Sequence, residues 1–261
     1  MIFFGKKEDS KKREIKENLG YKDLDIIEIP LEAVAAYWLS LKKVGGKNWK
    51  RIVEKEKSYT KEPFIKHILD LITSSFDEQK IRIYANYKKD TLLKEYNRKF
   101  VIISIGVLGI VNKENPQQIL IRIMSKFPLP PASDIKIYKN AQSLIQQYED
   151  KQDIFVDIYH GENSEILIKN LLFYVIVGRK YGIEKCLELS KNVRSNYFKE
   201  GLELINDGFD AEFIKYRLKL QQTEILYNTE QKMNMSIEMA IALKMNFSYD
   251  EMFKIAGSFF I

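Results

Sequence analysis

Residues 202–215 read LELINDGFDAEFIK, and this stretch decides the predicted fold. Its pattern is typical of a helix that ends in a tight turn at Asp207 and Gly208, followed by a second helix capped by Asp210. Residues 69–82, LDLITSSFDEQKIR, lie 133 positions earlier, match at six of the fourteen positions and place Asp77 as the cap. The match predicts an internal repeat of helix pairs. The alternative is two unrelated pairs that share the same capping chemistry.

The rest of the chain favours a mainly α-helical fold with two helical lobes. Its 261 residues include only 12 glycines and 6 prolines, too few for a protein built from many short strands. Three of the prolines fall within 128–131. We therefore expect an N-terminal lobe at 1–127 with a basic N-terminal arm, a linker at 128–132 and a C-terminal lobe at 133–261. At most a few short strands are expected, near 24–29 and 154–158.

Cysteine and histidine are too scarce for most metal sites and nucleophilic sites. Cys186 is the only cysteine, which excludes an internal disulfide and a cysteine-based zinc site, and the two histidines, His67 and His160, are far apart in sequence. Asp70 lies three residues after His67, so a helical enzyme with a site around His67 is an alternative, although such pairs are common on helix surfaces. We expect no enzyme activity, no metal and no cofactor.

The net charge of +6 and the absence of a long apolar segment bear on location and partners. The longest apolar stretch, residues 100–111, is shorter than the roughly 20 residues that span a bilayer. The first residues carry their apolar side chains before their charges, which is the reverse of a secretory signal. We therefore expect a cytoplasmic protein, with a basic surface suited to the inner face of a membrane. A nucleic-acid-binding regulator is an alternative, although acidic neighbours dilute the basic groups.

The segment around Asp207 also resembles a known family. Residues 178–183, GRKYGI, and 198–214, FKEGLELINDGFDAEFI, are similar to the cytoplasmic loop of the flagellar stator protein MotA of the MotA/TolQ/ExbB family. The resemblance covers about residues 178–240, and the repeat extends it to 61–110. That family spans the membrane four times, so the resemblance implies a soluble relative of its torque-transmitting portion. It also implies charged contact with a rotor through Arg179 and through Glu188, which lies one position later than the family's acid.

The end of the chain adds further candidates for partner binding. Phe259 and Phe260 are apolar terminal residues, the methionines between 233 and 252 suggest adaptable apolar surface, and Arg194 is another charged candidate. We expect a non-enzymatic cytosolic scaffold or adaptor that docks on a large membrane-associated assembly, the flagellar motor if the resemblance holds. A second resemblance is to the platform proteins of type II secretion and type IV pili, which carry two similar helical cytoplasmic domains. Their Gly-Glu-x-x-Gly signature is missing here.

Overall fold

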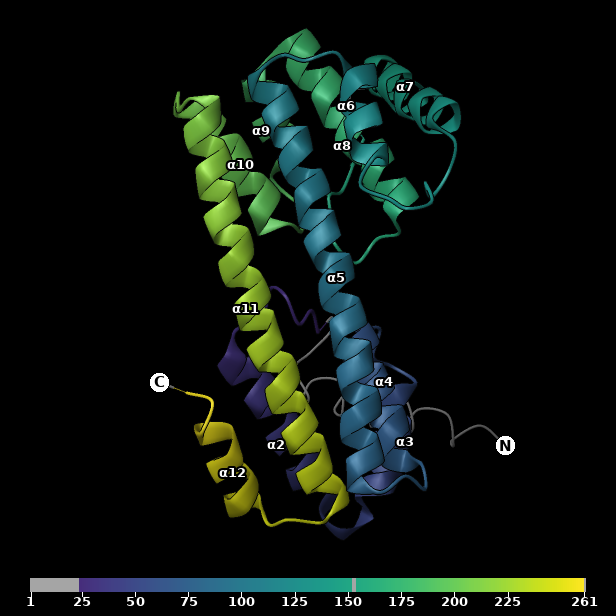
Figure 1. Ribbon diagram of the computed structural model, residues 1–261, viewed down its shortest axis with the longest axis vertical. Coiled ribbons are helices and arrows are strands. Elements are labelled where there is room, and N and C mark those ends of the chain that lie inside the picture. Colours follow the sequence, from purple (N-terminus) through teal and green to yellow (C-terminus); the bar gives the residue numbers. More distant parts are fainter. Residues whose placement is uncertain (1–23, 152–153, 261) are drawn as a thin grey trace, which may run out of the picture. The chain divides into compact units, whose positions relative to one another are not determined.

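The computed structural model describes residues 24–151 and 154–260, and helices cover most of them (Figure 1). Eleven α-helices, α2 to α12, and the short 3-10 helix η1 follow one another in this part of the chain, with no strand among them. The predicted mainly α-helical fold is therefore confirmed. The predicted basic N-terminal arm falls within residues 1–23, outside the described part.

Two compact units make up the fold. Of the described residues, unit 1 takes 24–93 and 227–260, and unit 2 takes 94–151 and 154–226. Two long helices, α5 (Glu78–Val111) and α11 (Ala211–Lys244), each contribute residues to both units. This division differs from the predicted lobes, because the proline stretch at 128–132 lies inside unit 2. The contacts that define unit 1 join the two ends of the chain, and local composition carries no signal of them.

Unit 1 is built around α2 (Leu31–Gly45), which packs on α3 (Trp49–Lys57) and on α12 (Tyr249–Gly257). η1 (Gly46–Asn48) joins α2 to α3, and α4 (Pro63–Thr73) packs on α3. The first part of α5 and the last part of α11 complete the unit. Trp38 and Phe64 are fully buried in its core. Proline begins α4 because a residue without an N–H is tolerated where no intrahelical partner exists.

Unit 2 is built around α8 (Ser164–Tyr181), which packs on α6 (Pro116–Met124), α7 (Asp134–Lys151) and α9 (Ile183–Ser190). α10 (Asn196–Asn206) packs on α9, and the last part of α5 and the first part of α11 belong to the same unit. Its core is rich in aromatic rings. Phe100 and Tyr197 meet edge to face with centroids 4.9 Å apart, and Tyr174 and Phe198 do the same at 4.9 Å.

The structure has no strand at either of the two predicted positions, 24–29 and 154–158. Residues 24–29 form a turn, in which the Ile27 N–H donates to Asp25 Oδ1 at 3.0 Å and the Ile29 N–H to the Asp25 carbonyl at 3.0 Å. Residues 154–158 are an irregular connection, and the Tyr174 hydroxyl donates to the Val156 carbonyl at 2.8 Å. These bonds pair backbone groups with a side chain and with turn contacts instead of with a neighbouring strand.

Both matching segments form a helix, a turn and a long helix with an aspartate at its start. The Lys80 N–H donates to Asp77 Oδ1 and the Phe213 N–H to Asp210 Oδ1, each at 2.9 Å. In the second segment, Asp207 lies at the C-terminal cap of α10 and Gly208 has a φ of +82°, a conformation that glycine adopts without strain. Shared capping contacts can also arise in unrelated helix pairs, so the internal repeat stays a prediction.

Candidate protein-docking surface

A stripe of large apolar side chains lies exposed at the start of α11, in unit 2. We call it the α11 stripe; its members are Phe209, Phe213, Tyr216 and Leu220, whose exposed fractions are 43, 38, 64 and 47%. Phe209 lies just before α11, and the spacing of three and four residues places Phe213, Tyr216 and Leu220 on one face of the helix. The opposite face carries Ile214 and Leu218, which are fully buried. Aligned exposed apolar residues of this kind are typical of a protein-binding surface rather than of scattered surface residues.

The turn before α11 and the contacts with α10 fix the position of the α11 stripe. The rings of Phe209 and Phe213 stack with centroids 4.6 Å apart. Arg217 donates to Glu200 Oε1 at 3.1 Å, and Gln221 donates to the other oxygen of the same carboxylate. The Tyr197 hydroxyl, in the core, donates to the Leu218 carbonyl at 3.1 Å. The helix that carries the stripe is therefore held on its buried side, while the stripe residues remain 38 to 64% exposed.

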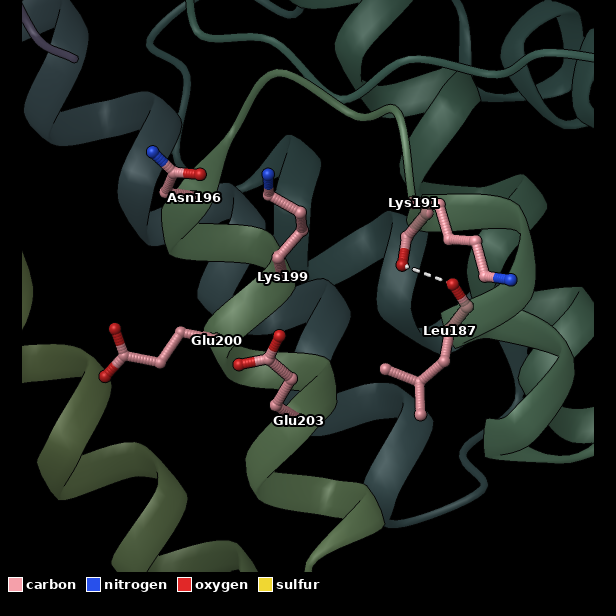
Figure 2. Close-up of a pocket in the computed structure, with 7 residues that line it drawn as sticks. Leu187, Lys191, Asn196, Lys199, Glu200 and Glu203 are labelled. Carbon is pink, nitrogen blue, oxygen red and sulfur yellow. Dashed lines mark hydrogen bonds between the residues drawn. The ribbon is translucent and has the colours of Figure 1, made fainter.

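A depression of about 700 Å³ lies between α9 and α10 in the same unit (Figure 2). Leu187, Ser190 and Lys191 line it from the α9 side, and Asn196, Lys199, Glu200 and Glu203 from α10. Figure 2 shows Lys199 and Glu203 on successive turns of α10, so charges of both signs border the depression. A mixed border with a single apolar side chain is suited to contact with a polar protein surface, not to enclosure of a small apolar ligand.

Three of the predicted partner-binding residues lie in unit 2. Arg179 is exposed near the end of α8 and donates to the Glu114 carbonyl at 3.5 Å. Glu188 is exposed on α9 and pairs with Lys185 at 2.7 Å, and this lysine holds the pKa of its carboxyl below the usual value. Arg194, in contrast, is engaged by its own chain.

The side chain of Arg194 contacts three residues of its own chain. Its Nε lies 2.5 Å from Asp157 Oδ2, its Nη2 lies 3.4 Å from Glu162 Oε1, and its guanidinium lies 3.6 Å from the centre of the Tyr159 ring. These contacts tie the loop before α10 to the connection before α8. The side chain is half exposed, yet its hydrogen-bonding groups face its own chain. We therefore assign Arg194 to positioning this loop.

The C-terminal candidates belong to unit 1. Phe260 is 39% exposed and Phe259 is half-buried, just after α12. Met252 and Ala256 of α12 are buried, and α12 packs on α2. Most of the methionines expected to form an adaptable surface are core residues: Met233, Met235, Met239 and Met252 are fully buried, and Met245 is exposed. The C-terminal segment thus stabilises unit 1.

A second exposed stripe, which the sequence reasoning missed, lies at the start of α5 in unit 1. It consists of Phe76, Ile83, Tyr84 and Tyr87, with ring centroids 5.3 Å apart for Phe76 and Tyr84 and 6.5 Å apart for Tyr84 and Tyr87. We call it the α5 stripe. The apolar spacing along this helix predicts that Ile81, Tyr84 and Tyr96 share its buried face; Ile81 and Tyr96 are buried, whereas Tyr84 is 41% exposed. The sequence does contain a signal for this stripe: intervals of seven residues from 76 to 83 and of four residues from 83 to 87 place apolar side chains on one helix face.

The alternative of a site around His67 finds little support in the contacts. Asp70, its expected partner, forms an ion pair with Lys57 at 2.7 Å. Burial lowers the pKa of His67, and its Nε2 is enclosed on α4 without a hydrogen-bond partner. Cys186 is fully buried, and burial raises the pKa of its thiol to about 12. Among the described residues, no three acidic, histidine or cysteine side chains gather in a way that would hold a metal ion.

The comparisons give no family. Neither the family models, nor the curated proteins, nor the solved structures that were compared contain a match to this chain. In the described ranges, each helix is too short or too polar to cross a bilayer. The resemblance to the stator loop accordingly stays a prediction.

Proposed function

We propose that the protein is a non-enzymatic scaffold or adaptor, and that a helix of a protein partner docks along the α11 stripe. The observation that carries this proposal is the line of four exposed apolar side chains from Phe209 to Leu220. Their spacing is that of a coiled-coil seam, so an amphipathic helix with its own apolar seam is the partner that fits. A few residues, often Trp, Tyr or Arg, carry most of the binding free energy in such interfaces, which makes Tyr216 the first residue to test.

The charges beside the α11 stripe support a protein partner of mixed charge. Glu212, Lys215 and Lys219 are exposed along one side of the stripe, and Lys215 pairs with Glu212 at 3.2 Å. Exposed charges of this kind contribute little to affinity but influence orientation and the rate of association. Arg179 and Glu188 remain the first charged residues to test outside the stripe.

A large membrane-associated assembly is the partner that we propose, and the flagellar motor is the specific candidate. Support for the motor comes from the resemblance of residues 178–240 to the stator loop, a range that contains the whole α11 stripe. The nucleic-acid and secretion-platform alternatives lack a comparable feature among the contacts described above.

Variant-dependent capture from native cells tests this proposal. The tagged full chain is compared with the double variant Phe213→Ser and Tyr216→Ser, and with the control Phe155→Ser, an aromatic that is 61% exposed in a loop of the same unit. We expect a captured protein that is lost with the double variant and retained with the control. Circular dichroism checks that both variants keep their helices. Equal capture by all three proteins would contradict docking on the stripe.

The identity of the captured protein tests the rest. A component of a membrane-associated assembly is expected, and weaker capture by the double charge reversal Arg179→Glu and Glu188→Lys would extend the surface to α8 and α9. A captured nucleic acid with a steep salt dependence would instead favour the regulatory alternative.

A further inference from the structure

The helices of the two halves of the chain begin and end at matching positions. α4, α5 and α6 span 63–73, 78–111 and 116–124, and α10, α11 and α12 span 196–206, 211–244 and 249–257. Each bound in the second set lies 133 residues after its counterpart, the offset of the sequence match at 69–82. α2 and α8 begin at 31 and 164, which are also 133 apart. Outside that match few residues agree, so the correspondence is one of structure.

An unusual turn recurs at the same offset. Lys113 and Asn246 are the two non-glycine residues with a positive φ in the described ranges, at +50° and +60°. Each ends a long helix through the same backbone hydrogen bonds: Lys113 N–H to Ile110 O at 3.1 Å, Glu114 N–H to Gly109 O at 3.0 Å, Asn246 N–H to Leu243 O at 3.1 Å and Phe247 N–H to Ala242 O at 2.9 Å. Such a conformation is uncommon outside glycine, so its recurrence at the matching position argues against two unrelated helix pairs.

Two buried lysines make the strongest correspondence. Lys99 on α5 donates to the carbonyl of His160 at 2.8 Å, and Lys232 on α11 donates to the carbonyl of Ile27 at 3.0 Å. Both lysines are only 6% exposed. Donor positions 99 and 232 are 133 residues apart, and so are acceptor positions 27 and 160. A buried ammonium group requires a polar partner, so each bond is a specific requirement of its unit.

Both bonds join one half of the chain to the other. The end of α5 and α6 come from the first half but belong to unit 2, where α6 packs on α8. The end of α11 and α12 come from the second half but belong to unit 1, where α12 packs on α2. Each unit therefore combines the first helices of one half with the last helices of the other.

We propose that the chain is a tandem duplication of one helical module, and that the two copies exchange their C-terminal helices. Residues 27–124 and 160–257 are the two modules. Each module carries a binding surface for the other, so that the protein is the fused form of a dimer with exchanged segments. α7 precedes the second module, and its counterpart, residues 1–18, lies outside the described part of the chain.

The duplication also relates the two exposed stripes. At the same offset, Phe76, Ile83 and Tyr87 of the α5 stripe correspond to Phe209, Tyr216 and Leu220 of the α11 stripe. If the proposed function holds, the chain therefore presents two equivalent docking surfaces, one in each unit. The exchange itself rests on the helix bounds, the turns and the lysines, and does not depend on the docking proposal.

Cleavage of the folded full chain tests the exchange. A specific protease site is inserted between Pro130 and Pro131, next to Leu129, which is 85% exposed. After cleavage we expect the two fragments to elute together at the size of the intact chain, and to recombine with native helicity after separation in denaturant. Fragments that separate as folded monomers would overturn the proposal.

Substitution of the two buried lysines, Lys99 and Lys232, tests whether both units depend on the exchange. In the cleaved protein, Lys99→Met and Lys232→Met are each expected to weaken fragment association roughly tenfold to a hundredfold, because each leaves a buried carbonyl without its charged donor. The controls are Lys94→Met and Lys219→Met, which remove exposed lysines from the same two helices and should leave association unchanged. Weakening by one buried lysine only, or by neither, would contradict exchange in both units.

Discussion

Glu62 should make the stability of unit 1 fall as the pH rises, and replacing it by glutamine should remove that dependence. Glu62 is the N-terminal cap of α4, where its Oε2 accepts the Ile65 N–H at 2.6 Å. The side chain is only 5% exposed. Burial raises the pKa of its carboxyl to about 7, with a smaller contribution in the same direction from Asp25 and opposing ones from its backbone hydrogen bonds.

The sign follows from the direction of this pKa shift. Because the pKa in the folded state is higher than in the unfolded chain, unfolding releases a proton between about pH 4.5 and 7. The stabilisation is complete below the unfolded pKa and is lost as the pH rises through the folded pKa. At about 1.4 kcal/mol for each pH unit, the loss over this range is about 3 kcal/mol.

Urea denaturation between pH 5 and pH 8 measures this effect. Other carboxyl groups also titrate near the lower end, so the informative quantity is the difference between the wild-type protein and Glu62→Gln. We expect the variant to lose less stability across this range by about 2.5 kcal/mol, since glutamine keeps an acceptor for the helix but carries no charge. The control is Ser195, a buried cap without a titrating group, which caps α10 and is 1% exposed. Ser195→Ala should cost about 1 kcal/mol at every pH.

Parallel pH profiles for the wild-type protein and Glu62→Gln would refute the reasoning. They would mean that water reaches the carboxylate, or that its capping hydrogen bonds offset the cost of burial. A profile for Ser195→Ala as steep as the expected difference would show that cap loss itself, rather than the titration of Glu62, depends on pH.

Two further predictions concern packing and thiol reactivity in the core. In Gly201→Ala the new methyl group would lie 2.9 Å from Val107 Cγ2; we expect a net loss of about 1 to 2 kcal/mol in urea denaturation, because overpacking outweighs the gain in helix propensity. Gly257→Ala, which meets no atom within 4 Å, is the control and should be neutral or slightly stabilising. Cys186, buried with a thiol pKa near 12, should resist iodoacetamide in the folded protein and react on unfolding; rapid native labelling would show that the thiol is accessible.

Helix starts could be predicted because they depend on a few adjacent residues. Asn115 followed by Pro116 predicts a helix start, and the Gln117 N–H donates to Asn115 Oδ1 at 2.9 Å. The units could not be predicted in this way. Their boundaries fall inside α5 and α11, where local sequence shows an unbroken helix. The units are defined by contacts between residues far apart in the chain, such as the bond from Lys232 to Ile27 within unit 1.

The candidate site was predicted less well, since apolar spacing alone does not reveal which face of a helix is covered. Tyr84 was placed on the buried face of its helix by that spacing, and it is exposed. Phe209 and Phe213 were not predicted as site residues. Their exposure depends on where α10 packs, and this information is absent from the local pattern. Arg194 presents the opposite case, in which a surface charge is held by Asp157 and Glu162.

The proposed duplication explains why the sequence match between the halves is short. Trp38 corresponds to Leu171, and Gly106 to Met239; all four residues are buried. Apolar core positions accept such changes as long as the total volume is filled. A buried carbonyl needs a donor at one position, so Lys99 and Lys232 agree, as do the turns at the ends of α5 and α11. A residue-by-residue match weights tolerant core positions and intolerant polar positions equally, and for that reason it detects only the capped turn.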